Sequence, residues 1–247
     1  MQLPSLMVAP NGASKTHDDH PRLPLTLGEV VRCARDCAAA GADGLHLHLR
    51  DGEGGHLLDS GAYREALTEL ARALPGLAVQ VTTESGGRYG PGHQAHVALH
   101  SGADMVSVSV REICREGEGL AARLYDEAAA RGIAIQHILY DREDAVHLER
   151  VLPGGVQAET QLIFVLGRYV AGQASDPAML EPFMYWLGGR PADWAVCAFG
   201  RGETACLRAA VEAGGKMRVG FENSLLHADG TVAEDNAARV RAVAGFR

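Results

Sequence analysis

The stretch Gly41-Ala-Asp-Gly-Leu-His-Leu-His-Leu-Arg-Asp51 decides the fold of this 247-residue chain. Side chains alternate between the two faces of a β-strand, so its three leucines share one face while His46, His48 and Arg50 share the other. This pattern suits a strand of a small closed barrel, because one face packs on outer helices and the other lines the interior. Unpaired imidazoles are costly to bury there. Two histidines that point the same way suit a divalent metal ion, with an open coordination position if the protein supplies only one further ligand.

Outward from this strand, short apolar runs alternate with longer alanine-rich amphipathic runs along the chain. This order predicts repeated β-α units and a parallel sheet. The helix after the first strand opens on Thr26 as N-cap, and Glu29 completes a capping box. We expect strands near residues 6–10, 44–50, 77–83, 105–110, 133–139, 161–166, 194–199 and 217–222, and the clearest helices over 26–40, 59–73, 118–131, 203–213 and 233–244.

Eight such units in about 250 residues is the count of a closed barrel. A doubly wound sheet more often shows fewer strands and a glycine fingerprint after the first one. Here the first strand runs into Ala9-Pro10-Asn11-Gly12 instead. The predicted fold is therefore α/β, a (β/α)8 TIM barrel that forms a single domain over residues 1–247. Its active site is expected at the carboxyl ends of the strands.

The composition is that of an ordinary globular protein, with 47% apolar and 22% charged residues. A net charge of -8, a pI near 5.7 and no basic run argue against nucleic acid or an anionic membrane as partner, and favour a small molecule. No apolar run approaches the roughly 20 residues of a membrane span, and no signal peptide is evident, so we expect a cytoplasmic protein. Five cysteines without a CxxC pair fit reduced thiols.

The eighth predicted strand, Met217-Arg-Val-Gly-Phe-Glu-Asn223, repeats the alternation of the second. Arg218 and Glu222 share one face. In a closed barrel this strand lies two strand spacings, roughly 10 Å, from the histidines, and side chains that converge on the interior can close that gap. His46, His48 and Glu222 are therefore the predicted metal ligands. The alternative for the histidines is a hydrogen-bonded core pair, and the alternative for Arg218 is an ion pair that only stiffens the barrel.

Hydroxyl groups on two other strands point to ligand binding. Thr82 alternates with valines on the third strand, and Ser107 and Ser109 alternate with valines on the fourth. A barrel built only for stability would fill these positions with branched aliphatic residues. The hydroxyls are therefore expected to bind a ligand, although hydroxyls also satisfy backbone groups locally.

Other histidines form patterns that resemble metal sites. His93, His96 and His100 follow helical spacing, and His17-Asp-Asp-His20 lies in a loop. A polar helix face and a loop without fixed geometry are both expected to be solvated.

Two glycine-rich segments follow predicted strands on the active face. Ser85-Gly-Gly-Arg-Tyr-Gly-Pro-Gly92 is either a flexible connection or a segment that closes over substrate. Phe199-Gly-Arg-Gly-Glu203 places the free amides near Gly200, together with Arg201, where barrels often hold phosphate. Both residues are candidates for binding a phosphorylated cofactor.

Several motifs, spread over nearly the whole chain, together resemble the beta-keto acid cleavage enzyme family. They are Gly12-Ala13, Leu23-Pro-Leu-Thr26, His46-Leu-His-Leu-Arg50, Gln80-Val-Thr82, Phe164-Val-Leu-Gly167, Gly200-Arg201 and Gly214-Gly-Lys-Met-Arg-Val-Gly-Phe-Glu222.

The resemblance implies a zinc-dependent (β/α)8 barrel, usually tetrameric, with one zinc per subunit held by His46, His48 and Glu222. It implies acyl transfer from a beta-keto acid to CoA, with acetyl-CoA as co-substrate and acetoacetate as product. A metal ion that polarises the keto oxygen lowers the cost of enolate character at the adjacent carbon. Arg50 in the HxHxR motif is then expected to bind substrate or cofactor. The resemblance implies a homo-oligomer, and because the chain is shorter than the usual member, a tetramer and a dimer both stay open.

The chain departs from the family pattern at two positions. Arg218 matches the arginine of the family's arginine-aspartate dyad, but Asn223 occupies the aspartate position, and an amide cannot act as a base. Asp141 and a metal-bound water are candidate replacements. Ser14, followed by Lys15, stands where the aminohexanoate enzyme has a glutamate, which disfavours a cationic amino substrate and favours a neutral or anionic beta-keto acid.

Two other classes of function compete with acyl transfer. One is a metal-dependent barrel hydrolase or aldolase that needs no CoA thioester. The other is a catalytically degenerate barrel that senses a metabolite, which Asn223 suggests because it replaces the catalytic aspartate of the family.

Overall fold

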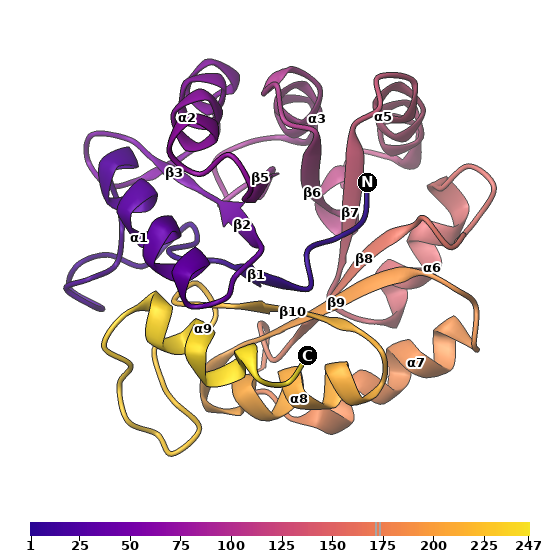
Figure 1. Ribbon diagram of the computed structural model, residues 1–247. Coiled ribbons are helices and arrows are strands. Elements are labelled where there is room, and N and C mark those ends of the chain that lie inside the picture. The colour runs from indigo at the N-terminus through magenta and orange to yellow at the C-terminus, as the bar shows by residue number, and fades with distance from the viewer. Residues whose placement is uncertain (171, 173) are drawn as a thin grey trace.

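A closed barrel of eight parallel strands forms the centre of the molecule. The computed structural model describes residues 1–247 except 171 and 173. In the order β1-β10-β9-β8-β7-β6-β5-β2 the strands return on themselves, because β1 pairs with both β10 and β2. The predicted (β/α)8 barrel is thereby confirmed (Figure 1). The barrel strands are β1 (Leu6–Val8), β2 (Gly44–Leu47), β5 (Ala78–Thr82), β6 (Met105–Ser109), β7 (Ala134–Leu139), β8 (Gln161–Leu166), β9 (Asp193–Ala198) and β10 (Lys216–Val219).

Helices surround the barrel, and Figure 1 shows them outside the ring of strands. Thr26 and Glu29 form the predicted capping box of the first helix. No helix among the described residues has the length and apolar character needed to cross a membrane. The helices are α1 (Leu27–Ala39), α2 (Ser60–Ala73), α3 (Pro91–His100), α4 (Val110–Ile113), α5 (Glu118–Ala130), α6 (Arg142–Val151), η2 (Pro177–Leu180), α7 (Glu181–Leu187), η3 (Gly200–Gly202), α8 (Glu203–Glu212) and α9 (Asn236–Ala244).

Two predicted strands end earlier than the side-chain alternation indicated. The stretch 44–50 divides after Leu47, and its second part, β3 (Leu49–Arg50), pairs antiparallel with β4 (His56–Leu57) outside the barrel. The stretch 217–222 leaves the sheet after Val219. Gly220 has φ +141, and a Cβ there would lie 2.4 Å from the carbonyl oxygen of Ala9, so only glycine fits. His48 and Glu222 therefore lie just beyond strand ends.

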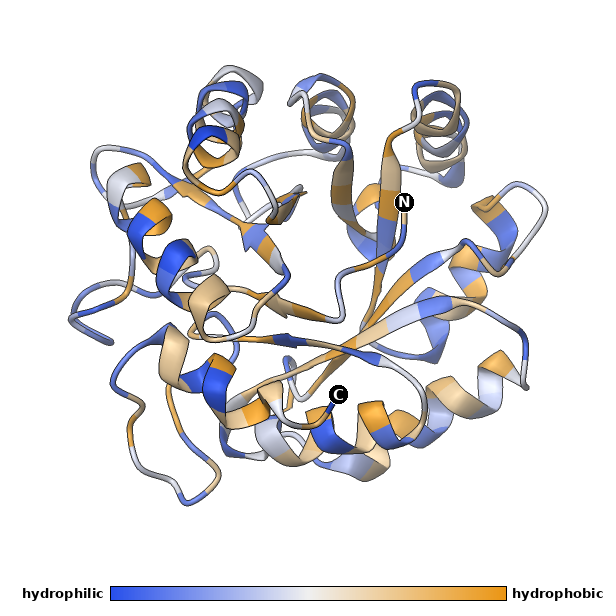
Figure 2. Ribbon diagram, in the orientation of Figure 1, coloured by the Kyte–Doolittle hydropathy of each residue, from blue (hydrophilic) through white to orange (hydrophobic). Residues whose placement is uncertain are grey.

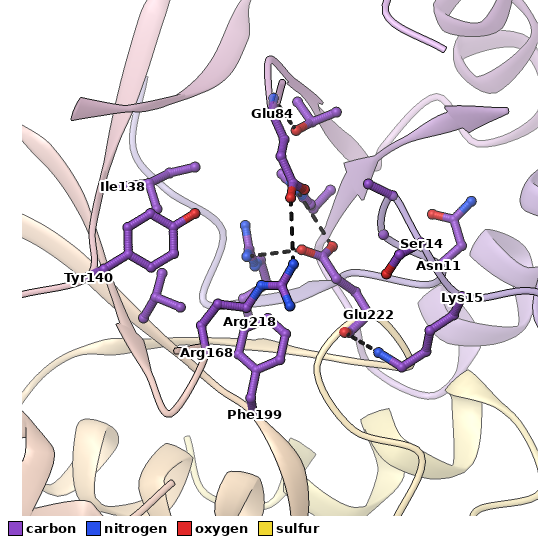
Figure 3. A pocket seen from close by; sticks show the side chains of 15 residues that line it. Asn11, Ser14, Lys15, Glu84, Ile138, Tyr140, Arg168, Phe199, Arg218 and Glu222 are labelled. Atoms are coloured by element: carbon purple, nitrogen blue, oxygen red, sulfur yellow. Dashed lines mark hydrogen bonds and ion pairs between the residues drawn. The ribbon is translucent and has the colours of Figure 1, made fainter. Parts of the chain in front are cut away.

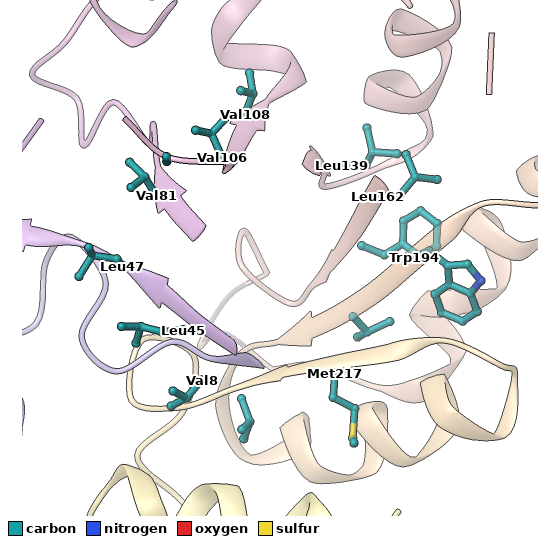
Figure 4. Packing of buried hydrophobic residues seen from close by; sticks show 14 of the residues in the cluster. Val8, Leu45, Leu47, Val81, Val106, Val108, Leu139, Leu162, Trp194 and Met217 are labelled. Carbon is teal, nitrogen blue, oxygen red and sulfur yellow. The ribbon is translucent and has the colours of Figure 1, made fainter. Parts of the chain in front are cut away.

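Three apolar clusters are buried among the described residues, and the two larger ones form the core of the barrel. The larger lies between barrel and helices and includes the leucines of β2, beside Val8, Val81 and Val106 (Figure 4). In Figure 2 the helices carry both orange and blue bands, consistent with one apolar face on the barrel and one polar face outward. The smaller region includes Met7, Met105 and Ile163, which alternate with helix-facing residues and fill part of the barrel interior.

Candidate active site

His46, His48 and Glu222 form the metal-ligand cluster found among the described residues. Their donor atoms all lie within 4.8 Å of one another. His46 Nε2 and His48 Nε2 are 3.1 Å apart. Glu222 Oε2 lies 3.7 Å from His46 Nε2 and 3.6 Å from His48 Nε2. Donors on one tetrahedral zinc ion at about 2.1 Å would be separated by roughly 3.4 Å. Glu222 Oε2 is buried without a hydrogen-bond partner in the described chain, so a cation would satisfy it. The residues fit zinc.

A chain of hydrogen bonds through the barrel interior orients His46. Its Nδ1 lies 2.7 Å from Gln80 Oε1, Gln80 Nε2 donates to Gln136 Oε1 at 2.9 Å, and Gln136 Nε2 donates to the carbonyl oxygen of Leu162 at 3.2 Å. Because that carbonyl can only accept, the direction of every bond in the chain is fixed. His46 Nδ1 therefore carries the proton, and its Nε2 presents a lone pair to the metal position.

Burial sets the protonation of the two histidines. It lowers the pKa of His46 to about 4, with the charge of Arg218 adding to the effect. It also holds the pKa of His48 well below its ordinary value, with His46 as the next cause. Both imidazoles are therefore neutral at pH 7, as metal binding requires. Burial would raise the pKa of Glu222, but Arg218 and His46 outweigh it and hold that pKa below its ordinary value.

The loop that carries Glu222 is held at each backbone amide. In residues 220–222 the amides donate in turn to Glu203 Oε1 at 3.3 Å, Asn236 Oδ1 at 2.8 Å and the carbonyl oxygen of Ala9 at 3.1 Å. Lys15 Nζ donates to the carbonyl oxygen of residue 222 at 2.7 Å. The acceptors come from α8, α9 and the end of β1, so barrel closure places the carboxylate.

The loop after β1 packs directly on Glu222. Gly12 has φ +62, and a Cβ there would lie 2.7 Å from Glu222 Cγ. Arg50, predicted to bind substrate or cofactor, donates to the carbonyl oxygens of Asn11, Gly12 and Lys15 instead. Its guanidinium therefore holds this loop against the metal-ligating residue Glu222.

A cavity of about 240 Å³ opens at the carboxyl ends of the strands, beside the metal ligands. It brings together five of the predicted residues, Ser14, His46, Thr82, Arg218 and Glu222. Figure 3 shows Glu84, Arg168 and Glu222 converging inside it. The full lining is Asn11, Gly12, Ala13, Ser14, Lys15, His46, Thr82, Glu84, Ile138, Tyr140, Val165, Arg168, Phe199, Arg218 and Glu222.

Two predicted catalytic residues lie outside this lining. Asp141 caps α6 and forms an ion pair with Arg111, so its carboxylate is already occupied. Asn223 is 2% exposed, and its amide atoms have no hydrogen-bond partner in the described chain. It makes no hydrogen bond to Arg218, which instead lies 3.3 Å from Cys197 Sγ.

Four predicted binding residues also lie away from the cavity wall. The hydroxyls of Ser107 and Ser109 are buried on β6 without partners among the described residues. Gly200 and Arg201 lie in η3, where Arg201 donates to the carbonyl oxygen of Asp229 at 3.3 Å. The cavity lining includes none of the four.

The other histidine patterns join no metal cluster in the part of the chain that the structure describes. His93 Nε2 lies 2.6 Å from the carbonyl oxygen of Leu58, and His96 stacks on His100. His20, expected to be solvated, is instead buried against Phe221. The alternation rule could not foresee this contact, because the partner comes from the opposite end of the chain.

Glu84 and Arg168 are charged residues of the cavity that the side-chain pattern did not single out. Glu84 lies two residues beyond the end of β5, with Oε2 3.8 Å from His48 Nε2 and Oε1 3.8 Å from Arg168 Nη2. Its backbone amide donates to Thr82 Oγ1 at 3.0 Å. Burial and the charge of Glu222 raise the pKa of Glu84 to about 7. The signal that could have found both residues is their place immediately after barrel strands.

Comparison with known proteins places these features in a family. The sequence model for "beta-keto acid cleavage enzyme" matches residues 5–246. A relative from Cupriavidus necator, "3-oxoadipate:acetyl-CoA acetyltransferase", is 26% identical over 98% of this chain and 87% of that protein. A "3-keto-5-aminohexanoate cleavage enzyme" from Fusobacterium nucleatum is 24% identical over 94% of this chain and 86% of that protein.

Solved structures share the barrel. The binary complex of ObcA with oxaloacetate has a TM-score of 0.66 and 13% identity over 90% of this chain, which spans 62% of that protein. The 3-hexulose-6-phosphate synthase of Salmonella typhimurium has a TM-score of 0.63 and 16% identity, over 100% of this chain and 98% of the other. At these identities the likeness shows the fold alone.

Proposed function

The chain belongs to the beta-keto acid cleavage enzyme family, and we propose that it is a zinc-dependent enzyme that cleaves a beta-keto acid with acetyl-CoA, giving acetoacetate and a new acyl-CoA. The observation that carries the proposal is the unpartnered Glu222 oxygen, which faces two neutral imidazoles beside a cavity lined by cations. Two imidazoles and one carboxylate leave a coordination position for substrate. When bound, zinc would act as a Lewis acid toward the keto oxygen.

The proposed reaction balances without any oxidant or reductant. The α-carbon of the keto acid loses a proton and attacks the acetyl carbonyl carbon, and CoA leaves as a thiolate. The thiolate then attacks the keto carbon, and the bond between the keto carbon and the α-carbon breaks. The α-carbon, which now carries the acetyl group and the carboxylate, takes a proton back and becomes part of acetoacetate.

Arg218 supports this chemistry as a buried cation on the cavity wall. It is 4% exposed, and its Nε and Nη1 have no partner in the described chain. A buried guanidinium with free donors is costly unless an anion completes it. We propose that Arg218 binds the carboxylate of the keto acid and stabilises the negative charge that develops when the α-carbon loses its proton.

Glu84 is the proton acceptor that the geometry favours. Asn223 has no basic form, and Asp141 is paired with Arg111 away from the cavity. Of the two carboxylates that line the cavity, Glu222 belongs to the metal ligands, which leaves Glu84. Its pKa of about 7 suits a base that works near neutral pH.

The test is a panel of beta-keto acids offered to the zinc-loaded protein with and without acetyl-CoA. We expect acetoacetate and a new acyl-CoA in equal amounts, only when the thioester is present, and a loss of both after a chelator has removed the metal. Cleavage that proceeds equally well without the thioester would instead identify a lyase or hydrolase. Light scattering on the same preparation measures whether the implied homo-oligomer forms.

A further inference from the structure

The cavity wall carries a pair of cations, Lys15 and Arg168, that in the described chain make no hydrogen bond or ion pair to the side chains of His46, His48 or Glu222. Resting on the proposed function, we propose that the substrate is a beta-keto acid whose far end carries a second carboxylate, bound by Lys15 and Arg168. The inference names the substrate class of the same site. The substrates in the names of relatives differ at the end away from the keto acid group, since one is a diacid and another is an amino acid.

With a divalent ion at the metal ligands, the positive charge around the cavity would exceed what a single carboxylate can balance. Lys15, Arg168 and Arg218 face Glu84 and Glu222, so cations outnumber anions before any metal binds. A divalent ion would raise the positive excess to three charges. A keto acid with one carboxylate leaves most of this excess, and a second carboxylate reduces it further.

Arg168 is available to a ligand. Its side chain is 31% exposed on the cavity wall, and the guanidinium lies over the ring of Phe199 at 5.0 Å. The nearest carboxylate oxygen, on Glu84, is 3.8 Å away, beyond hydrogen-bonding distance. This guanidinium makes no hydrogen bond to another residue of the described chain. It is therefore held in place by an aromatic face while its donors are free, as a carboxylate site requires.

Lys15 supplies the second positive charge. Its ammonium donates to the backbone carbonyl of Glu222 at 2.7 Å, which fixes the group at the cavity wall and leaves two donors. Lys15 and Arg168 are close enough for their charges to repel. An anion between two such cations relieves that repulsion, whereas an ammonium tail would add to it. Ser14 next to Lys15 offers no negative charge to a cationic tail.

The two cation sites come from different elements of the cavity wall, so each carboxylate of the substrate is assigned its own partner. Arg218 is buried beside Cys197 and Glu222, next to the metal ligands. Arg168 comes from the segment after β8, and in Figure 3 its side chain extends into the cavity from the side of Phe199. The reacting end of the keto acid therefore meets Arg218, and the far end meets Arg168 and Lys15.

The test compares three six-carbon keto acids that differ in the charge of the far end: 3-oxoadipate, 3-oxohexanoate and 3-keto-5-aminohexanoate, each with acetyl-CoA and zinc-loaded protein. We expect kcat/KM to be at least about tenfold higher for the diacid than for the other two, the size of one charge-assisted hydrogen bond. Equal values, or preference for the amine, would overturn the inference while leaving the proposed function intact.

Variants assign the preference to residues. Arg168→Gln and Lys15→Gln should each lower the ratio of kcat/KM for diacid over methyl-ended acid by about 10-fold, mainly through KM, and Arg168→Lys should recover part of the ratio. Arg72→Gln, an exposed arginine of α2 paired with Glu69, is the matched control. A ratio that Arg168→Gln leaves unchanged would contradict the assignment.

A final experiment tests the proposed carboxylate site separately from the proposed function. If no keto acid is turned over with acetyl-CoA, the proposed function fails, and calorimetric titration of 3-oxoadipate and 3-oxohexanoate into zinc-loaded protein then tests the carboxylate site alone. Tighter binding of the diacid that Arg168→Gln abolishes supports the site. Equal binding of the two acids refutes it. Thermal melts of each variant establish that it is folded before its binding is compared.

Discussion

Glu84 occupies the position that a proton acceptor needs, between the metal ligands and a free cation. Its two oxygens lie 3.8 Å from His48 and 3.8 Å from Arg168, so the carboxylate stands between the metal ligands and the proposed site for the far end of the substrate. Burial favours its neutral form and Arg168 favours its ionised form, and the balance leaves the pKa at about 7. A carboxylate with this pKa changes its protonation where the enzyme would work.

Replacing Glu84 by glutamine should lower kcat/KM by about 10²- to 10⁴-fold, the usual contribution of a positioned base. In the parent protein kcat/KM should rise with pH through the pKa of Glu84, which is about 7 without metal and lower when a dication is bound nearby, because only the ionised carboxyl accepts a proton. Steady-state rates between pH 5.5 and 9 measure both effects, with zinc content as control, since Glu84 is outside the ligand cluster. Unchanged rates in Glu84→Gln, together with a large gain in Asn223→Asp, would reassign the base.

Gly12 controls the position of the metal-ligating carboxylate through space rather than charge. A Cβ at φ +62 would meet Glu222 Cγ at 2.7 Å, so Gly12→Ala should move Glu222 and weaken zinc binding by roughly 10- to 100-fold. Gly54→Ala is the matched control, because it imposes the same backbone strain at φ +80 with no atom nearer than 4.0 Å. Competition with a chelating dye measures both affinities. Equal losses in the two variants would mean that backbone strain alone is responsible.

Helices α8 and α9 are joined by an ion pair that also supports the ligand loop. Glu203 and Arg239 are 1% and 0% exposed and lie 2.5 Å apart, and the other oxygen of Glu203 accepts from the amide of Gly220. The pair therefore connects two helices to the turn that carries Glu222. Its cost of burial is offset only while both charges are present.

Arg239→Met should destabilise the protein by about 3–5 kcal/mol, because Glu203 is left buried and unpaired. Adding Glu203→Gln should restore part of that stability, since the uncharged amide still accepts from Gly220. Urea unfolding of the single and double variants measures the two free energies. A double variant as unstable as the sum of its single changes would show that the two side chains do not interact.

At the level of elements, alternation predicted much of the barrel. The faces of the second strand agree with the structure, and barrel closure brings Glu222 to His46 and His48 as expected from strand order. The strand ends were wrong, because alternation gives no sign of where pairing stops. The stop at Gly220 depends on the close approach of Ala9, which exists only in the folded chain.

The cavity-lining loops were harder to predict for a related reason. Glu84 and Arg168 lie beyond β5 and β8, where side chains no longer alternate and the path of the chain depends on tertiary contacts. Asp141 follows β7 in the same way, yet it caps α6 rather than facing the cavity. Sequence can therefore indicate that residues after strands are candidates, but the contacts that select among them are not local.

Across the whole molecule, burial removes the charge from several histidines at once. Besides the two metal ligands, burial lowers the pKa of His56 and lowers that of His137 to about 3. His137 packs edge-on against Tyr125 between β7 and α5, and burial alone causes its shift. Each such ring must take up a proton on unfolding once the pH falls below about 6.5. Acid should therefore destabilise this fold earlier than titration of its carboxylates would.

The direction of this pH effect follows from the protonation of each histidine in the folded and in the unfolded chain. A histidine with a lowered pKa contributes its full stability above pH 6.5, and the contribution decreases as the pH falls toward the folded value, by about 1.4 kcal/mol per pH unit for each ring. Urea titrations of chelator-treated protein between pH 7.5 and 4.5 measure the unfolding free energy, which should fall as the pH falls. The slope of this fall reports the number of protons taken up on unfolding, and His137→Gln should reduce that number by about one. His96→Gln, at an exposed site on α3, is the matched control. If both variants follow the parent curve, burial of His137 is not what makes the fold sensitive to acid, and the slope must come from the rings around the metal site.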